Sequence, residues 1–386
     1  MLKRQIRKKI DELRSKYPVI QVTGPRQSGK TTLVKQIFKD YKYKNLENPD
    51  ERLIAQKDPR SFLKLGSGQK MIIDEVQMVP ELVSFIQVEV DEQKINGQFV
   101  ITGSQNFKIS ETVSQSLAGR VAIFELLPLS YEELGKYKDK LEIAELLWKG
   151  FFPAVYSRNI SPVDFYRDLT NTYITRDVRS IKNIGNLSNF QRFLGLLAGR
   201  VGQLLNKVSL ADDVGISVKT VEEWLSILEA SYLVVRLQPF FENVSKRLVK
   251  SPKVYFSDTG LVAYLLGINS VEELKKHFIY GSLFENFIIM EKLKYVYNHR
   301  KNEGLYFWRD SKGVEIDLLV DRGLNKSLVE IKLGQTFNSD FLKNIKKVSP
   351  LLEGKYRLAK YLVYGGEGYG QTSGVMVQNW RQFVKI

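Results

Sequence analysis

A phosphate-binding loop motif near the N-terminus constrains this chain more than any other feature. Residues 24–31 are Gly-Pro-Arg-Gln-Ser-Gly-Lys-Thr, which satisfies the pattern G-x-x-x-x-G-K-[ST]. An apolar, strand-like run over residues 19–22 precedes the motif, and a helical stretch follows it from Thr32. In this strand–loop–helix context, inward-facing backbone N–H groups and the positive end of the helix favour phosphate. The sequence therefore predicts an α/β P-loop domain that binds ATP.

The motif and the next acidic strand end supply the predicted nucleotide site. Lys30 is expected to neutralise the β and γ oxygens of ATP, and Thr31 to ligate Mg²⁺. The apolar strand at residues 71–73 ends in Asp74, which is placed to complete the Mg²⁺ shell, and Glu75, which is placed to orient or deprotonate water. The residues expected to contact the nucleotide are Gly24, Pro25, Arg26, Gln27, Ser28, Gly29, Lys30, Thr31 and Thr32.

Two further residues complete the predicted set of catalytic residues for ATP hydrolysis. A strand at residues 99–102 ends at Gly103, so we predict that Ser104 lies between the first two strands, near the γ-phosphate. Arg120 precedes the strand at residues 121–126 and is predicted to neutralise transition-state charge in its own or a neighbouring subunit. A surface ion pair is the alternative for this arginine.

The remaining segments predict a multidomain α/β protein, because 386 residues exceed one ordinary hydrophobic core. Residues 2–16 have a narrow apolar stripe typical of a packed helix, and residues 18–134 alternate strands with helices around a parallel sheet. Residues 128–230 are mainly helical, whereas residues 278–386 open with an amphipathic helix and continue with strands at 305–309, 314–320 and 327–333.

A helix-turn-helix pattern lies within the helical stretch. Residues 209–225 predict two helices joined by a turn at Gly215, with Ser217 capping the second helix. Strands within residues 232–256 would form a wing, whose cations would pair with backbone phosphates of DNA. Glu222 and Glu223 on the second helix would instead repel phosphate, so a protein-docking or lid role stays open. The wing cations are Lys246, Arg247, Lys250 and Lys253.

The chain resembles a family of AAA-type archaeal and bacterial ATPases that carry a C-terminal domain of unknown function with a restriction-endonuclease-like core. The resemblance rests on GPRQSGKT, MIIDEVQ, ITGSQ and SLAGR, and it continues at residues 173–177, 253–260 and 281–286. It implies an AAA+ P-loop ATPase domain at 1–135, a helical linker with a winged helix at 136–270, and a PD-(D/E)xK nuclease-like α/β domain at 271–386.

The C-terminal strands carry a second group of candidate site residues. Period two places Glu330 and Lys332 on one face of their strand, and Asp317 lies on the preceding strand. If Asp317 faces them, two carboxylates hold Mg²⁺ while lysine activates water, as in PD-(D/E)xK nucleases including archaeal Holliday-junction resolvases. Glu285 on the preceding helix would add a metal-binding oxygen. A nuclease-like fold that only binds its partner is the alternative.

The amino-acid composition limits which partners the protein can bind and in which cell compartment it is expected. The net charge of +15 favours a polyanion, which would be DNA, RNA or anionic lipid, and a soluble surface that is merely rich in lysine is the alternative. The absence of cysteine excludes disulfides and thiolate chemistry. No apolar run reaches membrane-spanning length and the basic N-terminus lacks a signal-peptide core, so we expect a cytoplasmic protein without membrane insertion.

The sequence as a whole therefore predicts an Mg²⁺-dependent ATPase that couples ATP to nucleic-acid binding. The alternatives are an ATP-gated, metal-dependent DNA nuclease and a non-catalytic signalling switch that captures a protein partner. Formation of an oligomer stays open in each case.

Overall fold

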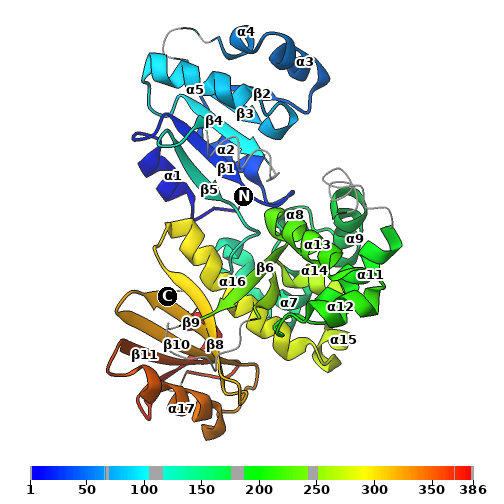
Figure 1. The fold of residues 1–386 in the computed structure, drawn as a ribbon, viewed down its shortest axis with the longest axis vertical. Coiled ribbons are helices and arrows are strands. Elements are labelled where there is room, and N and C mark those ends of the chain that lie inside the picture. The colour runs from blue at the N-terminus through cyan, green and yellow to red at the C-terminus, as the bar shows by residue number, and fades with distance from the viewer. Residues whose placement is uncertain are drawn as a thin grey trace.

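The computed structural model describes residues 2–64, 66, 69–103, 116–174, 187–241, 251–368 and 370–383. The N-terminal sheet lies at one end of the long axis and a second, larger sheet at the other, with a body of helices beside them (Figure 1). Within these ranges no helix combines the length and the apolar character needed to cross a bilayer.

The N-terminal part is built on a five-stranded parallel sheet with the order β2-β3-β4-β1-β5. This confirms the predicted α/β fold and its four apolar strands. The edge strand β2 was not predicted, because its sequence Lys-Tyr-Lys-Asn is polar. The strands are β1 (Val19–Thr23), β2 (Lys42–Asn45), β3 (Met71–Asp74), β4 (Phe99–Gly103) and β5 (Val121–Glu125).

Helices cover both faces of this sheet, and each face has its own apolar cluster. The predicted N-terminal helix is present over a shorter range, with Ile6 and Ile10 packed into the cluster that contains Leu33 and Val34 of α2. The P-loop therefore leads into a helix that is anchored on the sheet. The elements are α1 (Arg7–Leu13), α2 (Lys30–Ile37), α3 (Pro49–Lys57), α4 (Pro59–Leu63), η1 (Val76–Met78) and α5 (Leu82–Gln93).

The middle of the chain is helical, as predicted. Gly215 has a φ of 80°, and the Ser217 side chain accepts a hydrogen bond from the Thr220 N–H (3.0 Å), so the predicted turn and cap between α12 and α13 are present. The elements are η2 (Glu132–Lys140), α7 (Ile143–Lys149), α8 (Pro153–Ser157), α9 (Pro162–Leu169), η3 (Thr170–Ile174), α11 (Leu187–Ala198), α12 (Lys207–Val214), α13 (Val218–Ala230), α14 (Thr259–Leu265) and α15 (Val271–Lys276).

The second sheet has eight strands in the order β12-β13-β11-β10-β9-β8-β6-β7. The two strands expected to form a wing, β6 and β7, pair with each other, and β6 also pairs with β8. They therefore extend the C-terminal sheet. The strands are β6 (Val234–Pro239), β7 (Lys253–Phe256), β8 (Gly304–Arg309), β9 (Glu315–Arg322), β10 (Asn325–Lys332), β11 (Arg357–Tyr364), β12 (Gly370–Thr372) and β13 (Val375–Asn379).

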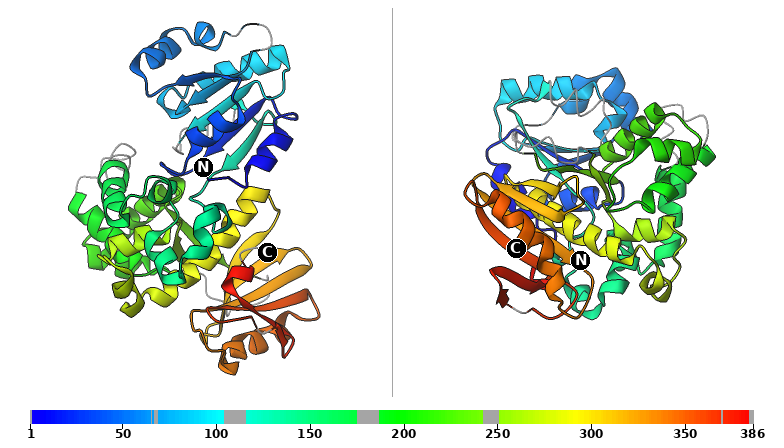
Figure 2. Two further views of the ribbon diagram at one scale, coloured as in Figure 1. Left: turned by 180° about the vertical axis from the view of Figure 1, so that it is seen from behind. Right: turned by 60° about the horizontal axis from the view of Figure 1, so that its bottom comes forward.

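The 20-residue helix α16 (Tyr280–His299) lies between the two sheets in Figure 1 and in the left view of Figure 2. Buried residues of α16, including Phe287 and Ile288, join one apolar cluster that runs from the middle helices to the C-terminal sheet. The division of the chain into three domains stays a prediction. The remaining C-terminal elements are η4 (Ser339–Leu342), α17 (Lys343–Leu352) and α18 (Trp380–Phe383).

Candidate functional site

The P-loop leaves β1 at Thr23 through a backbone conformation that requires glycine. Gly24 has a φ of 144°, and a Cβ atom there would lie 2.2 Å from the carbonyl oxygen of Leu126. Gly29, with a φ of 94°, occupies the position before the first residue of α2. Both glycines thus permit turns that a side chain would strain or block. The geometry explains why the motif needs glycine at its two ends.

Lys30 points into the loop. Its side chain is buried, and Nζ donates hydrogen bonds to the carbonyl oxygens of Gly24 (3.0 Å) and Pro25 (2.9 Å). Burial lowers the pKa of Lys30 to about 8, although the nearby Glu75 and Asp74 oppose the shift. The ammonium group is therefore held beside neutral carbonyls, and a phosphate would be a stronger partner for it.

The metal-binding pair that the sequence predicts does meet. Thr31 Oγ1 donates a hydrogen bond to Asp74 Oδ2 (2.8 Å), although the two residues come from different segments. Tyr43 on β2 donates to the same oxygen (2.7 Å), and Thr102 on β4 contacts the other oxygen of the carboxylate. Sequence reasoning missed Tyr43 because β2 is polar. Thr102 lies at the carboxyl end of the predicted strand at residues 99–102, and this position could have indicated that its side chain lies near Asp74.

Glu75 follows β3 in a left-handed conformation, with a φ of 58°. Its carboxylate accepts a hydrogen bond from the Gln77 side chain and lies on the wall of the pocket next to the P-loop. Burial raises the pKa of Glu75, which Lys30 opposes. A carboxylate with a raised pKa beside a pocket is suited to act as a base.

A pocket of about 530 Å³ lies between the P-loop and the middle helices. On the helical side, Arg158 is exposed and directly follows α8. No motif marked Arg158, because its position depends on packing between distant segments. The lining residues are Arg26, Gln27, Gly29, Lys30, Thr31, Thr32, Glu75, Pro153, Ala154, Ser157, Arg158 and Thr172.

A second, less polar pocket of about 210 Å³ shares part of the same wall. Leu2, Leu33 and Leu129 line it, and the two pockets share Gly29, Thr32, Pro153 and Ser157. The combined space therefore has a charged part beside the loop and an apolar part beside the N-terminal segment. This division suits a ligand with a phosphate chain and an aromatic base.

Arg4 connects the P-loop to the segment that follows the first sheet. Its Nη1 donates to the Ser28 carbonyl oxygen (2.8 Å) and its Nη2 to the Leu127 carbonyl oxygen (2.6 Å). Its Nε is 3.0 Å from Glu133 Oε2, in an ion pair with almost no solvent exposure. This arginine was missed because its partners are distant in sequence.

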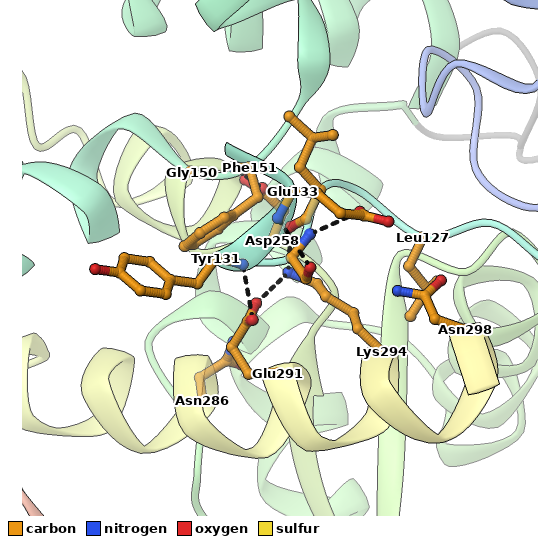
Figure 3. Close-up of polar contacts among 12 residues, drawn as sticks. Leu127, Tyr131, Glu133, Gly150, Phe151, Asp258, Asn286, Glu291, Lys294 and Asn298 are labelled. Carbon is orange, nitrogen blue, oxygen red and sulfur yellow. Dashed lines mark hydrogen bonds and ion pairs between the residues drawn. The ribbon is translucent and has the colours of Figure 1, made fainter. Parts of the chain in front are cut away.

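A buried polar network continues from Glu133 to α16 (Figure 3). The Tyr131 N–H donates to Glu291 Oε2 (2.8 Å), and Lys294 Nζ donates to the Leu129 carbonyl oxygen (2.8 Å). Glu291 and Lys294 also pair with each other at 3.0 Å. The segment that supports the P-loop is thus tied to the long helix between the two sheets.

The structure does not place the other two predicted catalytic residues, Ser104 and Arg120, at the ATPase site. Ser104 lies outside the described residues. Arg120 immediately precedes β5, and the register of β1 with β5 places it at the opposite end of the sheet from the P-loop. Its side chain binds Asp91, with Nη2 2.8 Å from Oδ2. The assignment of Arg120 to the nucleotide site of its own chain is therefore wrong, and a role in a neighbouring subunit stays a prediction.

The three predicted residues of the C-terminal site do lie together. Lys332 Nζ is 2.9 Å from Glu330 Oε2 and 3.3 Å from Asp317 Oδ2. The Ile331 N–H also donates to Asp317 Oδ2 (2.7 Å). Burial and the neighbouring Asp317 raise the pKa of Glu330 to about 9. The D…E-x-K arrangement is present as a set of contacts.

The predicted metal ligands of this site do not fit a metal ion. Glu285 on α16 is close enough to Asp317 for their charges to interact, but its Oε1 binds Lys253 Nζ (3.0 Å), which also binds Glu315. Among the described residues, no three carboxylate or imidazole side chains converge to hold a metal. The assignment of Glu285, Asp317 and Glu330 to one metal site is therefore not supported. Lys253 is also buried, so it cannot pair with DNA as a wing cation.

The nucleotide pocket, by contrast, fits a phosphate-bearing ligand. The Ser28 hydroxyl is buried at the loop and, within the described residues, has no hydrogen-bond partner. Gly24 and Gly29 shape a cradle, and Lys30 supplies a cation within it. An unsatisfied donor and a cation at a helix N-terminus are the features that bind phosphate.

Comparisons with known proteins agree with this geometry. Family models match three consecutive parts of the chain: an AAA domain at residues 16–135, the domain of unknown function DUF8612 at 140–272, and the domain of unknown function DUF4143 at 280–383. The uncharacterized protein Rv2008c of Mycobacterium tuberculosis is 32% identical over 325 residues, which cover 83% of this chain and 71% of that protein. The chain belongs to this family of AAA-domain proteins.

Other relatives and structures extend the comparison. The chain is also similar to the uncharacterized protein MJ1544 of Methanocaldococcus jannaschii, which is 26% identical over 90% of this chain and 82% of its own length. The Walker-type ATPase PABY2304 of Pyrococcus abyssi has a TM-score of 0.38 at 15% identity, covering 68% of this chain and 94% of that chain. The Holliday-junction branch-migration motor RuvB of Thermotoga maritima has a TM-score of 0.32 at 19% identity, covering 61% and 90%. The match of residues 16–135 to the AAA-domain model identifies the N-terminal part of this chain as an AAA-type ATPase domain.

Proposed function

We propose that this protein binds Mg²⁺-ATP in the pocket beside the P-loop and hydrolyses it. The observation that carries the proposal is the contact between Thr31 and Asp74 next to Lys30, at the wall of a pocket of about 530 Å³. Lys30 would exchange its two carbonyl partners for phosphate oxygens, and Thr31 and Asp74 would hold the ion. Magnesium held there supplies charge neutralisation at the phosphate oxygens.

Glu75 is the proposed base. It lines the pocket close enough to Lys30 for their charges to interact, and burial raises its pKa, which favours a role as a proton acceptor. Gln77 binds the same carboxylate and would keep it oriented. The apolar pocket between Leu2 and Leu129 would receive the base of the nucleotide. The ligand would thus touch both the sheet and the middle helices.

The pocket lies between the P-loop and the middle helices, and this position supports coupling of ATP binding to a conformational change of the chain. Arg158 and α8 form one wall of the pocket, and Arg4 joins the loop itself to Leu127 and Glu133. A ligand that contacts both walls favours the state in which they approach each other. We propose that the approach of the two walls is transmitted to α16 through its hydrogen bonds with residues 129–131.

We further propose that the responding partner is a nucleic acid. The net charge of +15 supports a polyanion. Of Glu222 and Glu223, the two acidic residues of α13 expected to oppose phosphate, Glu222 is neutralised by Arg236 (2.6 Å) and Lys207 (3.1 Å). The expected wing cations Lys246, Arg247 and Lys250 lie outside the described residues.

An ATPase assay with and without nucleic acid tests both parts of the proposal. Purified wild type should release phosphate from ATP only with Mg²⁺, and single-stranded, duplex or branched DNA, or RNA, should raise the rate. Equal turnover in wild type and Lys30→Ala would contradict the site. Turnover that no nucleic acid changes would remove the nucleic-acid partner.

The same assay separates the signalling-switch alternative. Very slow turnover with nucleotide retained through purification would favour a switch that captures a protein partner. For the nuclease alternative, Asp317, Glu330 and Lys332 do lie together, but Lys253 occupies the carboxylate of Glu285, the third expected metal ligand.

A further inference from the structure

A buried lysine lies among the acidic residues of the C-terminal sheet. Lys253 is only 3% exposed, and its Nζ lies 3.0 Å from Glu285 Oε1 and also in contact with Glu315 Oε1. The two carboxylates come from different elements, α16 and β9, and β7 brings the lysine between them. One cation thus joins three elements.

The backbone of Lys253 is fixed, so the side chain is not a mobile surface lysine. β7 pairs with β6 through Leu237 and Lys253, and Leu204 forms a bridge to the other side of Lys253. Two residues further along β7, Tyr255 donates a hydrogen bond to the same Glu285 oxygen (2.5 Å). Burial and the contacts with two carboxylates therefore hold the ammonium group inside this cluster.

The neighbouring carboxylates already have cationic partners as well. Arg309 Nη1 lies 2.6 Å from Glu315 Oε2, and Lys332 binds both Asp317 and Glu330. A divalent cation in this cluster would need the oxygens that these groups occupy, at roughly 2.0–2.2 Å. The ammonium group and a metal ion therefore compete for one place, and their charges repel.

We propose that Lys253 takes the place of the cation in this cluster. The wild-type C-terminal sheet consequently binds no divalent metal there, and replacing Lys253 with a neutral side chain opens a cation site formed by Glu285 and Glu315. The proposal departs from the metal-dependent nuclease that the fold resemblance implies, and it does not depend on ATP binding.

Binding of Mn²⁺ to the full-length wild type without nucleotide is the first test. Electron paramagnetic resonance should count the same number of tightly bound ions in wild type and in Asp317→Asn. A tightly bound ion in wild type that Asp317→Asn removes would overturn the proposal. This arm needs no Lys253 variant to fold.

The second test asks whether loss of the ammonium creates a site. Lys253→Met should bind one Mn²⁺ more than wild type, with an affinity at least ten times that of any Mn²⁺ binding by wild type at this cluster. The double variant Lys253→Met and Glu315→Gln should lose that ion. Lys326→Met is the matched control, because Lys326 is equally buried in the same sheet but, among the described residues, forms an ion pair with one carboxylate, that of Asp321. Equal Mn²⁺ binding by Lys253→Met and wild type would overturn the proposal.

Thermal melting gives a readout that tolerates a destabilised variant. Mn²⁺ should raise the melting temperature of Lys253→Met by about 2–4 °C and leave that of wild type and Lys326→Met unchanged. Lys253→Gln, a polar replacement, is the second variant should Lys253→Met not fold. A rise of the same size in wild type, or none in either Lys253 variant, would contradict the proposal.

Discussion

The two acidic centres of this molecule look alike in sequence and differ in structure. Each combines two carboxylates with a lysine. At the P-loop, Lys30 faces neutral backbone carbonyls beside a pocket of about 530 Å³. In the C-terminal sheet, Lys253 and Lys332 bind the carboxylates themselves.

This difference shows that a motif predicts which residues come together, but not whether their charges are available to a ligand. The charges of the C-terminal centre are satisfied within the protein, so an incoming ion would have to displace a buried group. The P-loop keeps a lysine bound only to neutral groups and a buried hydroxyl without a partner among the described residues. The first centre is arranged to receive a ligand, whereas the second is arranged to hold strands and a helix together.

The largest expected effect comes from Glu75→Gln, which removes the proposed base but keeps the shape of the pocket. ATP turnover should fall by about 10²–10⁴-fold, while ATP affinity stays within about threefold of wild type. Glu81→Gln, at an exposed residue of the same segment, is the control and should turn over normally. Phosphate release and binding of a fluorescent ATP analogue measure the two quantities. Unchanged turnover in Glu75→Gln would contradict the role of Glu75 as the base and, with it, the proposed difference between the two acidic centres.

Lys30→Ala should weaken ATP binding by about 10- to 100-fold, because it removes charge-assisted hydrogen bonds to phosphate. Lys39→Ala, at an exposed position just after α2, should bind ATP as wild type does. Isothermal titration calorimetry with a non-hydrolysable analogue is the measurement. If both variants bind equally well, the cation in the loop is not a phosphate ligand.

The pH dependence of ATP binding sharpens the comparison. With a pKa of about 8, Lys30 is mostly charged at pH 7 and mostly neutral at pH 9. Only the charged form attracts phosphate, so ATP affinity should fall by about tenfold over this range, and bound ATP should raise the pKa of Lys30. Lys30→Arg, which stays charged, should flatten the profile. A flat profile in wild type would contradict the burial of this lysine in solution.

Arg158→Ala should have the smallest effect, raising the KM for ATP about three- to tenfold, because water screens this exposed side chain. Arg167→Ala is the matched control, since Arg167 is an exposed arginine on α9 that pairs with Asp164. Steady-state kinetics of both variants decide the point. A similar KM in the two variants would remove α8 from the ligand site.

Sequence predicted what local motifs and strand periodicity determine. The loop, its helix and the acidic end of β3 lie as expected, because parallel strands bring their carboxyl ends to one edge. Period two likewise placed Glu330 and Lys332 together. The role of Lys253 was not predictable, since it depends on β6 and β7 joining a sheet built from later residues. Arg158 was missed for the same reason, because packing between distant segments positions it, whereas Tyr43 was missed because its strand, β2, is polar.

A count of Mn²⁺ ions bound with and without a non-hydrolysable ATP analogue tests the central claim most directly. Wild type and Asp317→Asn should each bind one tight Mn²⁺ per chain only when the analogue is present, and Lys30→Ala should bind none under the same conditions. Binding of a tight ion without nucleotide, lost in Asp317→Asn and kept in Lys30→Ala, would place the metal chemistry in the C-terminal sheet and contradict the account.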